Sequence, residues 1–163
     1  MKQLKYLAAT LILAAIVLSA CVKEKDFPTT PVIIFKKYDS YTTDSADCVI
    51  TFKDGDGDIG VLEDDSASPN DFRLKYLYKD TTDGVFKHLD DPATVAADTL
   101  FISYRVPNLT PEGQYKALDG EIRAKLRGLI YFPTHPIVKF EVTLYDRAGH
   151  RSNVVTTDEI VVP

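Results

Sequence analysis

Three aspartates alternate with two glycines in the run Asp54-Gly55-Asp56-Gly57-Asp58, directly after a predicted strand. Carboxylates this close repel one another, while glycines let the backbone curl so that the carboxylate oxygens converge. Such an oxygen cage suits a hard cation, and Ca²⁺ takes about six to eight oxygen ligands. Asp and Gly also form turns without any ion, so a solvated turn is the open alternative.

The spacing of these aspartates resembles the start of an EF-hand calcium loop, but the remainder departs from that pattern. The sixth position is Ile59 rather than glycine, the twelfth is Asp65 rather than glutamate, and the flanks read as strands. If the loop binds Ca²⁺, it is therefore a different kind of loop. Glu63, Asp64 or Asp65 would supply extra ligands.

The sequence contains no recognisable catalytic motif. His88, His135 and His150 lie in or beside predicted turns and have no partner at zinc-binding spacing. There is no Gly-x-Ser-x-Gly nucleophile turn and no phosphate-binding glycine loop. The neighbouring carboxylates Asp90 and Asp91 are typical of a solvated loop. We therefore expect no enzymatic activity, with a hydrolase assembled only in the folded chain as a competing hypothesis.

The elements that must position these residues follow from a two-residue alternation of apolar and polar side chains, which predicts strands. In chain order the predicted strands are Val32–Tyr38, Asp47–Lys53, Phe72–Lys79, Val85–Leu89, Leu100–Val106, Ile122–Arg127, Val138–Leu144 and Val154–Val162. About seven to eight short strands, each with one polar and one apolar face, predict an all-β fold. We expect a single antiparallel β-sandwich over residues 32–163.

Residues 1–20 have the layout of a secretory signal peptide. Two lysines precede the apolar run Leu7–Val17, which is shorter than the about 20 residues of a membrane-spanning helix. The following Leu-Ser-Ala-Cys ends at Cys21 and resembles the bacterial lipobox, whose cysteine is acylated and becomes the new N-terminus. The resemblance implies a lipoprotein carrying fatty acids such as palmitate on Cys21, with residues 21–31 as the lipidated tether.

Other segments resemble those of a family of uncharacterised Bacteroidetes lipoproteins. The charged stretch Val22–Asp26 is similar to their export signal for the outer face of the outer membrane, although a solvated tether has the same composition. Phe52–Gly60 and Leu109–Gln114 also fit this family. Asp146–Asn153 resembles the turn before the last strand of immunoglobulin-like and fibronectin-type-III-like domains, with His150 where asparagine is commoner. The resemblance implies an immunoglobulin-like fold and an envelope location, but no activity.

That fold carries one expectation about the acidic loop. In an immunoglobulin-like sandwich, the loop after the second strand and the loop before the last strand lie at the same end. Asp146 should therefore lie near Asp54, Asp56 and Asp58 as a further candidate ligand. Because the first strand also starts at this end, the acidic loop should face the tether.

Charge and cysteine content narrow the possible partners. The chain has 19 basic and 24 acidic residues, a formal charge of −5, which argues against nucleic acid as a partner. With Cys21 acylated, Cys48 is alone and cannot form an internal disulfide. Its place in the alternation predicts an inert core residue, with a reactive thiol as the alternative.

A set of basic side chains could also form a binding surface. Arg123, Lys125 and Arg127 alternate along one predicted strand, with Arg73 and Lys75 as candidate neighbours. They would form either a patch for an acidic glycan or protein, or an ordinary solvated sheet face. The latter is the usual meaning of such alternation.

Together these observations predict a non-enzymatic, lipid-anchored binding or structural module of the cell envelope, with calcium as its candidate stabilising ion. Its expected place is the outer membrane, with exposure at the cell surface. The membrane, through Cys21, and an envelope protein or glycan are the expected partners. The alternative is a glycan-binding accessory lipoprotein of a nutrient-uptake system.

Overall fold

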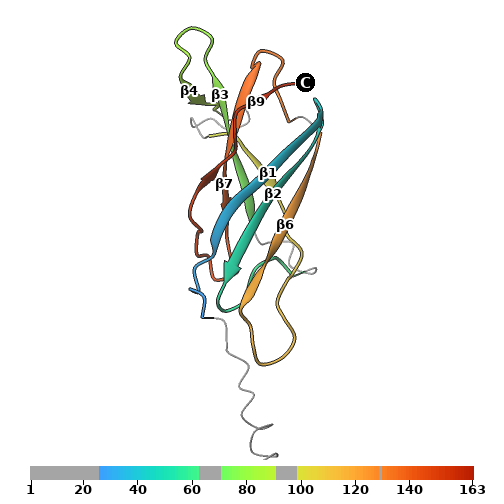
Figure 1. The fold of residues 1–163 in the computed structure, drawn as a ribbon, viewed down its shortest axis with the longest axis vertical. Helices are drawn as coiled ribbons and strands as arrows, with labels where there is room; N and C mark the ends of the chain where they lie inside the picture. The colour runs from blue at the N-terminus through green and yellow to red at the C-terminus, as the bar shows by residue number, and fades with distance from the viewer. Residues whose placement is uncertain (1–25, 63–70, 91–98, 129) are drawn as a thin grey trace, which may run out of the picture.

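The structure of the protein is a computed structural model that describes residues 26–62, 71–90, 99–128 and 130–163. Over these residues the chain is all-β and forms two antiparallel sheets around one core, which is consistent with a β-sandwich. Figure 1 shows β1 crossing in front of the second sheet, with β2 and β6 beside it on the right. The predicted signal peptide and Cys21 lie outside the described residues.

The first sheet has three strands in the order β1-β2-β6, with β2 antiparallel to both neighbours. Its strands are β1 (Val32–Thr42), β2 (Ser45–Asp54) and β6 (Leu118–Arg127). The strand β6 has the predicted alternation, because its buried side chains come from every second residue. These inward residues are Ile122, Ala124 and Leu126.

The second sheet is built around β3 (Phe72–Lys79) and β7 (Ile137–Leu144), which pair along most of their length. The other edge of β3 pairs with β5 (Phe101–Tyr104) and then with β4 (Phe86–His88). The other edge of β7 pairs with β8 (Val155–Thr156) and β9 (Ile160–Val161). Each predicted strand region therefore overlaps at least one strand of the structure, although β1 and β6 are longer than predicted.

The last predicted strand is wrong in one respect, because Val154–Val162 forms two short strands rather than one. Between them, the Thr157 N–H donates to the Phe140 carbonyl at 3.0 Å. The Thr157 hydroxyl accepts a hydrogen bond from the Phe140 N–H, also at 3.0 Å. A side-chain oxygen thus replaces a backbone carbonyl in the ladder, and the strand is interrupted there.

The predicted basic cluster is also divided by the fold. Arg123 and its neighbours lie on β6 of the first sheet, whereas Arg73 and Lys75 lie on β3 of the second sheet. The two groups therefore share no sheet face. The Arg123 guanidinium lies 3.3 Å from the carboxylate of Asp47, and Arg127 lies 3.6 Å from the same residue. These ion pairs support the interpretation of a solvated sheet face.

Aromatic rings join the two sheets inside the core. Phe140 of β7 is fully buried and stacks on Tyr38 of β1, with ring centroids 5.5 Å apart. It also makes an edge contact with Tyr76 of β3 at 5.6 Å. Cys48 is fully buried, and burial raises its pKa to about 12. Its thiol is therefore protonated and belongs to the core, as its place in the alternation predicts.

A side-chain amide closes the sandwich along the edge of β1. Asn153 accepts a hydrogen bond from the Ile33 N–H at 2.8 Å and donates to the Ile33 carbonyl at 2.9 Å. An amide presents the same donor and acceptor as a peptide group, so it can pair with a strand edge as a neighbouring strand would. Asn153 thereby ties the segment before β8 to the first sheet.

We expect the substitution Phe140→Ala to lower the free energy of unfolding by about 3–5 kcal/mol, because it removes a buried ring shared by both sheets. Urea denaturation measures this loss. Ile34→Ala is the control, since Ile34 is 63% exposed, and it should change stability by about 0.5 kcal/mol or less. Equal losses in the two variants would contradict the described core.

Candidate metal centre

The acidic loop begins at the last residue of β2. Ala46, Cys48, Ile50 and Phe52 are buried positions of this strand, and Asp54 is the next residue in the same alternation. Side chains two residues apart point to the same face of a strand. The alternation that buries the apolar side chains therefore also buries the Asp54 side chain, which is 0% exposed.

After Asp54 the chain turns sharply against neighbouring backbone. Gly57 has a φ of +69°, which favours glycine, and a Cβ there would lie 2.1 Å from the Lys116 carbonyl oxygen. Gly55 contacts the residues before β1, and its Cβ would lie 2.2 Å from the Phe27 carbonyl oxygen. Both glycines are thus required by the close approach of other chain segments.

This turn brings the three aspartates together. Asp54, Asp56 and Asp58 each offer a carboxylate oxygen, and these oxygens lie within 4.8 Å of one another. Two oxygens bound to one Ca²⁺ at about 2.3–2.6 Å can be at most about 5 Å apart. The separation therefore suits ligands of a single ion. Asp54 is buried, Asp58 is half-buried and Asp56 is exposed, so the cluster opens to solvent on one side.

Hydrogen bonds satisfy only part of this cluster. The Asp58 N–H donates to Asp54 Oδ2 at 3.1 Å, and the Ala148 N–H donates to Asp58 Oδ2 at 3.0 Å. The other oxygens, Asp54 Oδ1 and Asp58 Oδ1, are buried and have no hydrogen-bond partner. Most buried polar atoms in native proteins have a partner, so each exception calls for an explanation.

The cluster is also electrostatically strained. Burial, followed by the charge of Asp56, raises the pKa of Asp54 from 3.8 to about 6. The pKa of Asp58 is raised as well, first by burial and then by the charge of Asp146. The protein thus holds carboxylates where their charged form is disfavoured, and a bound cation would relieve this.

Asp146 lies beside the acidic loop, as strand order led us to expect. Ile59 and Asp146 form an isolated bridge, and the Arg147 N–H donates to the Asp58 carbonyl at 3.2 Å. Both carboxylate oxygens of Asp146 contact His150: Oδ1 accepts from its backbone N–H at 2.7 Å, and Oδ2 lies 2.8 Å from its Nδ1. Asp146 therefore acts on Asp58 through its charge while its oxygens hold His150. The candidate ligands Glu63, Asp64 and Asp65 lie outside the described residues.

The Arg147 side chain contributes contacts that the sequence analysis missed. Its guanidinium donates to the Gly60 carbonyl at 2.7 Å and to Asn108 Oδ1 at 2.9 Å, and it also contacts the Thr110 hydroxyl. These bonds tie the acidic loop to the segment that follows Val106. In the sequence, only the position of Arg147 next to Asp146 could have suggested a role at this site. The residues that its guanidinium contacts are distant in sequence.

The histidines are dispersed in the fold and have different partners. His88 lies 3.5 Å from Asp90, His135 Nδ1 lies 3.2 Å from the Tyr76 hydroxyl, and His150 pairs with Asp146. Ser152 is close to the last pair in sequence, but its hydroxyl is bonded to backbone groups and the residue is 5% exposed. The described residues thus give this pair no free serine nucleophile from its own turn. Asp91 lies outside them.

Comparison with known proteins gives no further guide to this site. No family model, no curated protein and no solved structure matches this chain. Among the described residues, no helix is long and apolar enough to cross a membrane.

The raised pKa of Asp54 predicts how stability depends on pH when no divalent cation is present. Below pH 3.8 Asp54 is protonated in both the folded and the unfolded protein. Between pH 3.8 and about 6 the unfolded protein has lost this proton and the folded protein still keeps it. Above about pH 6 the folded protein carries the buried negative charge. The free energy of unfolding should therefore fall as pH rises from about 4 to about 7, by up to about 3 kcal/mol from this group.

The variant Asp54→Asn isolates this contribution. In EDTA at pH 8 it should be more stable than the wild type, and its stability should depend less on pH in urea denaturation. Asp158→Asn, which changes an exposed aspartate, should keep the pH dependence of the wild type. If the free energy of unfolding changed with pH in the same way for the wild type and Asp54→Asn, the charged form of Asp54 would not destabilise the fold.

Proposed function

We propose that this chain is a non-enzymatic, lipid-anchored module of the bacterial outer membrane, displayed at the cell surface, with a binding or structural role. Its anchor is an acylated Cys21, and its partner is an envelope protein or a glycan. The domain is proposed to be an immunoglobulin-like β-sandwich related to fibronectin-type-III domains.

The strand order supports this type of sandwich. In immunoglobulin domains strands A, B and E share one sheet, and strands C, F and G share the other. The first, second and sixth strands here pair as A, B and E would. The sheet that contains β3, β7, β8 and β9 matches C, F and G, and β4 and β5 lie on the outer edge of β3.

One observation carries the proposed role: the chain enters the domain at the acidic loop. The Gly55 N–H donates to the Pro28 carbonyl at 2.9 Å, so the segment after the expected anchor lies against this loop. The described N-terminal residues lie at the lower end of the molecule in Figure 1. An anchor at Cys21 would therefore keep this end near the membrane and present the opposite end outward.

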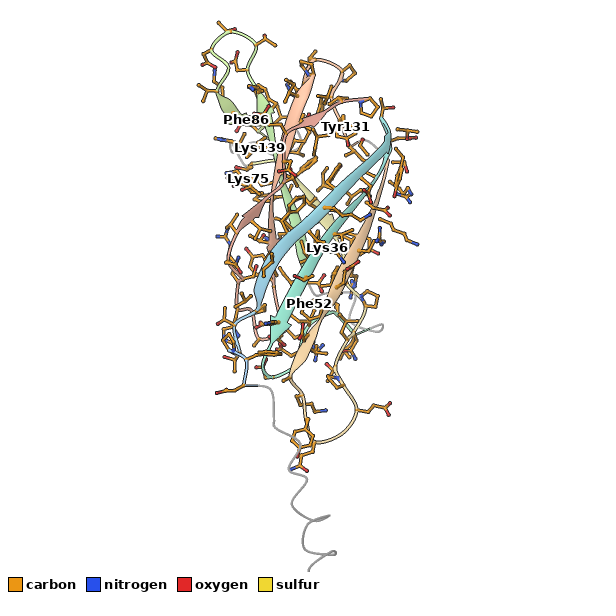
Figure 2. All side chains as sticks on the ribbon, viewed as in Figure 1. Lys36, Phe52, Lys75, Phe86, Tyr131 and Lys139 are labelled. Carbon is orange, nitrogen blue, oxygen red and sulfur yellow. The ribbon has the colours of Figure 1, made fainter. Side chains whose placement is uncertain are left out.

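The opposite end has a surface suited to a partner. The β1–β2 turn and the loop between β6 and β7 enclose a depression of about 750 Å³, lined by Tyr131, Phe132 and His135 among others. Figure 2 places Tyr131 near this upper end and Phe52 toward the acidic-loop end. The His135 ring stacks on Tyr78 with centroids 4.1 Å apart, which holds it at the rim.

The substitution Cys21→Ala tests the anchor. The wild type should fractionate with membranes and carry acyl groups on Cys21, whereas the variant should appear in the soluble fraction, because acyl chains supply the membrane affinity. Cys48→Ala is the matched control and should stay with the membranes. Mass spectrometry of the native protein tests whether Cys21 is the acylated N-terminus. An unmodified N-terminal residue upstream of position 21 would refute lipidation.

The glycan-binding alternative rests on the aromatic lining of the outer depression, because sugar rings stack on aromatic faces. A glycan array probed with the lipoprotein should then give hits that Phe132→Ala abolishes. Phe101→Ala, which removes another partly exposed ring (44%) on β5, should retain them. An array without hits, or hits that both variants keep, would count against this alternative and leave a protein partner as the proposal.

A further inference from the structure

We propose that Asp54, Asp56 and Asp58 bind one Ca²⁺ ion, and that this ion holds the segment before β1 against the acidic loop. The ion would then set how the domain leaves its anchor. The metal site stands on the described residues alone. Its consequence for orientation rests on the proposed lipid anchor.

The three aspartates form a donor set that suits Ca²⁺. Three carboxylates converge within 4.8 Å, and hard oxygen ligands of this kind suit Ca²⁺. Proximity alone would be ordinary for an acidic loop. The second, independent observation is that Asp54 Oδ1 belongs to a residue with 0% exposure and has no hydrogen-bond partner. Asp58 Oδ1 is likewise buried without a hydrogen-bond partner, so two carboxylates of the cluster each keep one oxygen that a cation could bind.

Two positively charged side chains, those of Arg147 and Lys53, lie near the acidic loop. The Arg147 guanidinium donates to the Gly60 carbonyl, to Asn108 and to Thr110. The Lys53 ammonium lies over the Phe27 ring, 5.2 Å from its centroid. The Arg147 charge acts on Asp58, but among the described residues neither cation makes a direct contact with an aspartate carboxylate of the cluster. The charge of the cluster is better balanced by an ion that enters from the solvent side, where Asp56 is exposed.

The proposed ligands are adjacent to the contact between the acidic loop and the segment before β1. Gly55 lies between two of the proposed ligands, and its N–H donates to the Pro28 carbonyl at 2.9 Å. The missing Cβ allows the Phe27 carbonyl to pack against it. An ion that draws Asp54 and Asp56 together would fix the Gly55 amide in the orientation that holds Pro28. Without the ion, repulsion between the carboxylates would loosen this contact.

The Gly55 amide therefore reports on both parts of the proposal. Calorimetry with CaCl₂ and hydrogen exchange at the Gly55 amide, followed by NMR, can be made on the acylated lipoprotein in detergent micelles. We expect saturable binding, with a dissociation constant of about 1 mM or tighter, as in extracellular calcium modules. We also expect Gly55 exchange about tenfold or more slower in Ca²⁺ than in EGTA, and a higher melting temperature.

Four variants separate the effect of the ion from that of the tether contact. Asp54→Asn and Asp56→Asn should both abolish calcium binding and the effect of calcium on Gly55 exchange. Because Asp56 is exposed, its substitution leaves the buried core unchanged. Asp83→Asn, in another Asp-Gly turn, should respond as the wild type does. Phe27→Ala should keep calcium binding but show faster Gly55 exchange, because it removes the ring that lies against Lys53 of β2 and so weakens the attachment of the segment before β1.

Each outcome has a defined meaning. No binding heat and no change in melting temperature at millimolar Ca²⁺ would overturn the metal site. Equal affinity for Mg²⁺, which demands a tighter octahedral geometry, would overturn the assignment to calcium. Binding without any change at Gly55 would retain the site and overturn its link to the tether. Absence of acyl groups on Cys21 would refute the proposed anchor. It would not change the conclusions drawn from calcium binding, melting temperature or Gly55 exchange.

Discussion

The side chain of Asp54 is buried because it occupies the next inward position of β2 after Cys48, Ile50 and Phe52. The period of a strand does not distinguish apolar from charged side chains, so the core that the apolar residues create also encloses the last carboxylate. The partnerless Oδ1 atom and the raised pKa of Asp54 both follow from this position. The site therefore depends on the register of the central strand of the first sheet.

The surrounding contacts explain how the fold tolerates this carboxylate. The acidic loop is held by backbone hydrogen bonds and close glycine contacts from three directions: the residues before β1, the segment before β6 and the turn after β7. These contacts oppose the repulsion among the three carboxylates, which acts to move them apart. A cation is a natural way to stabilise carboxylates that are confined in this manner.

The two ends of the sandwich thus have different properties. One end gathers the chain entry, the acidic loop and the turn that contains Asp146. The other carries a wide depression bordered by Tyr131 and His135. For a domain attached by its N-terminus, this division suits an anchored base and an outward binding surface. The long strands β1 and β2 run between the two ends.

The local features of this protein could be predicted from its residues and their spacing. Alternation located the strands, because burial on one face of a sheet repeats every second residue. It also placed Cys48 in the core and singled out Asp54, Asp56 and Asp58 from their spacing. The proximity of Asp146 to them followed once a strand order was assumed.

The contacts between segments that are distant in sequence could be identified only in the folded chain. The pairing of Thr157 with Phe140 divides the last strand, and sheet assignment separates Arg73 and Lys75 from β6. The contacts of Arg147 with Asn108, and of Gly55 with Pro28, likewise join residues far apart in the chain. Periodicity reports the environment of a residue along its own strand, whereas such contacts depend on how whole sheets pair and pack.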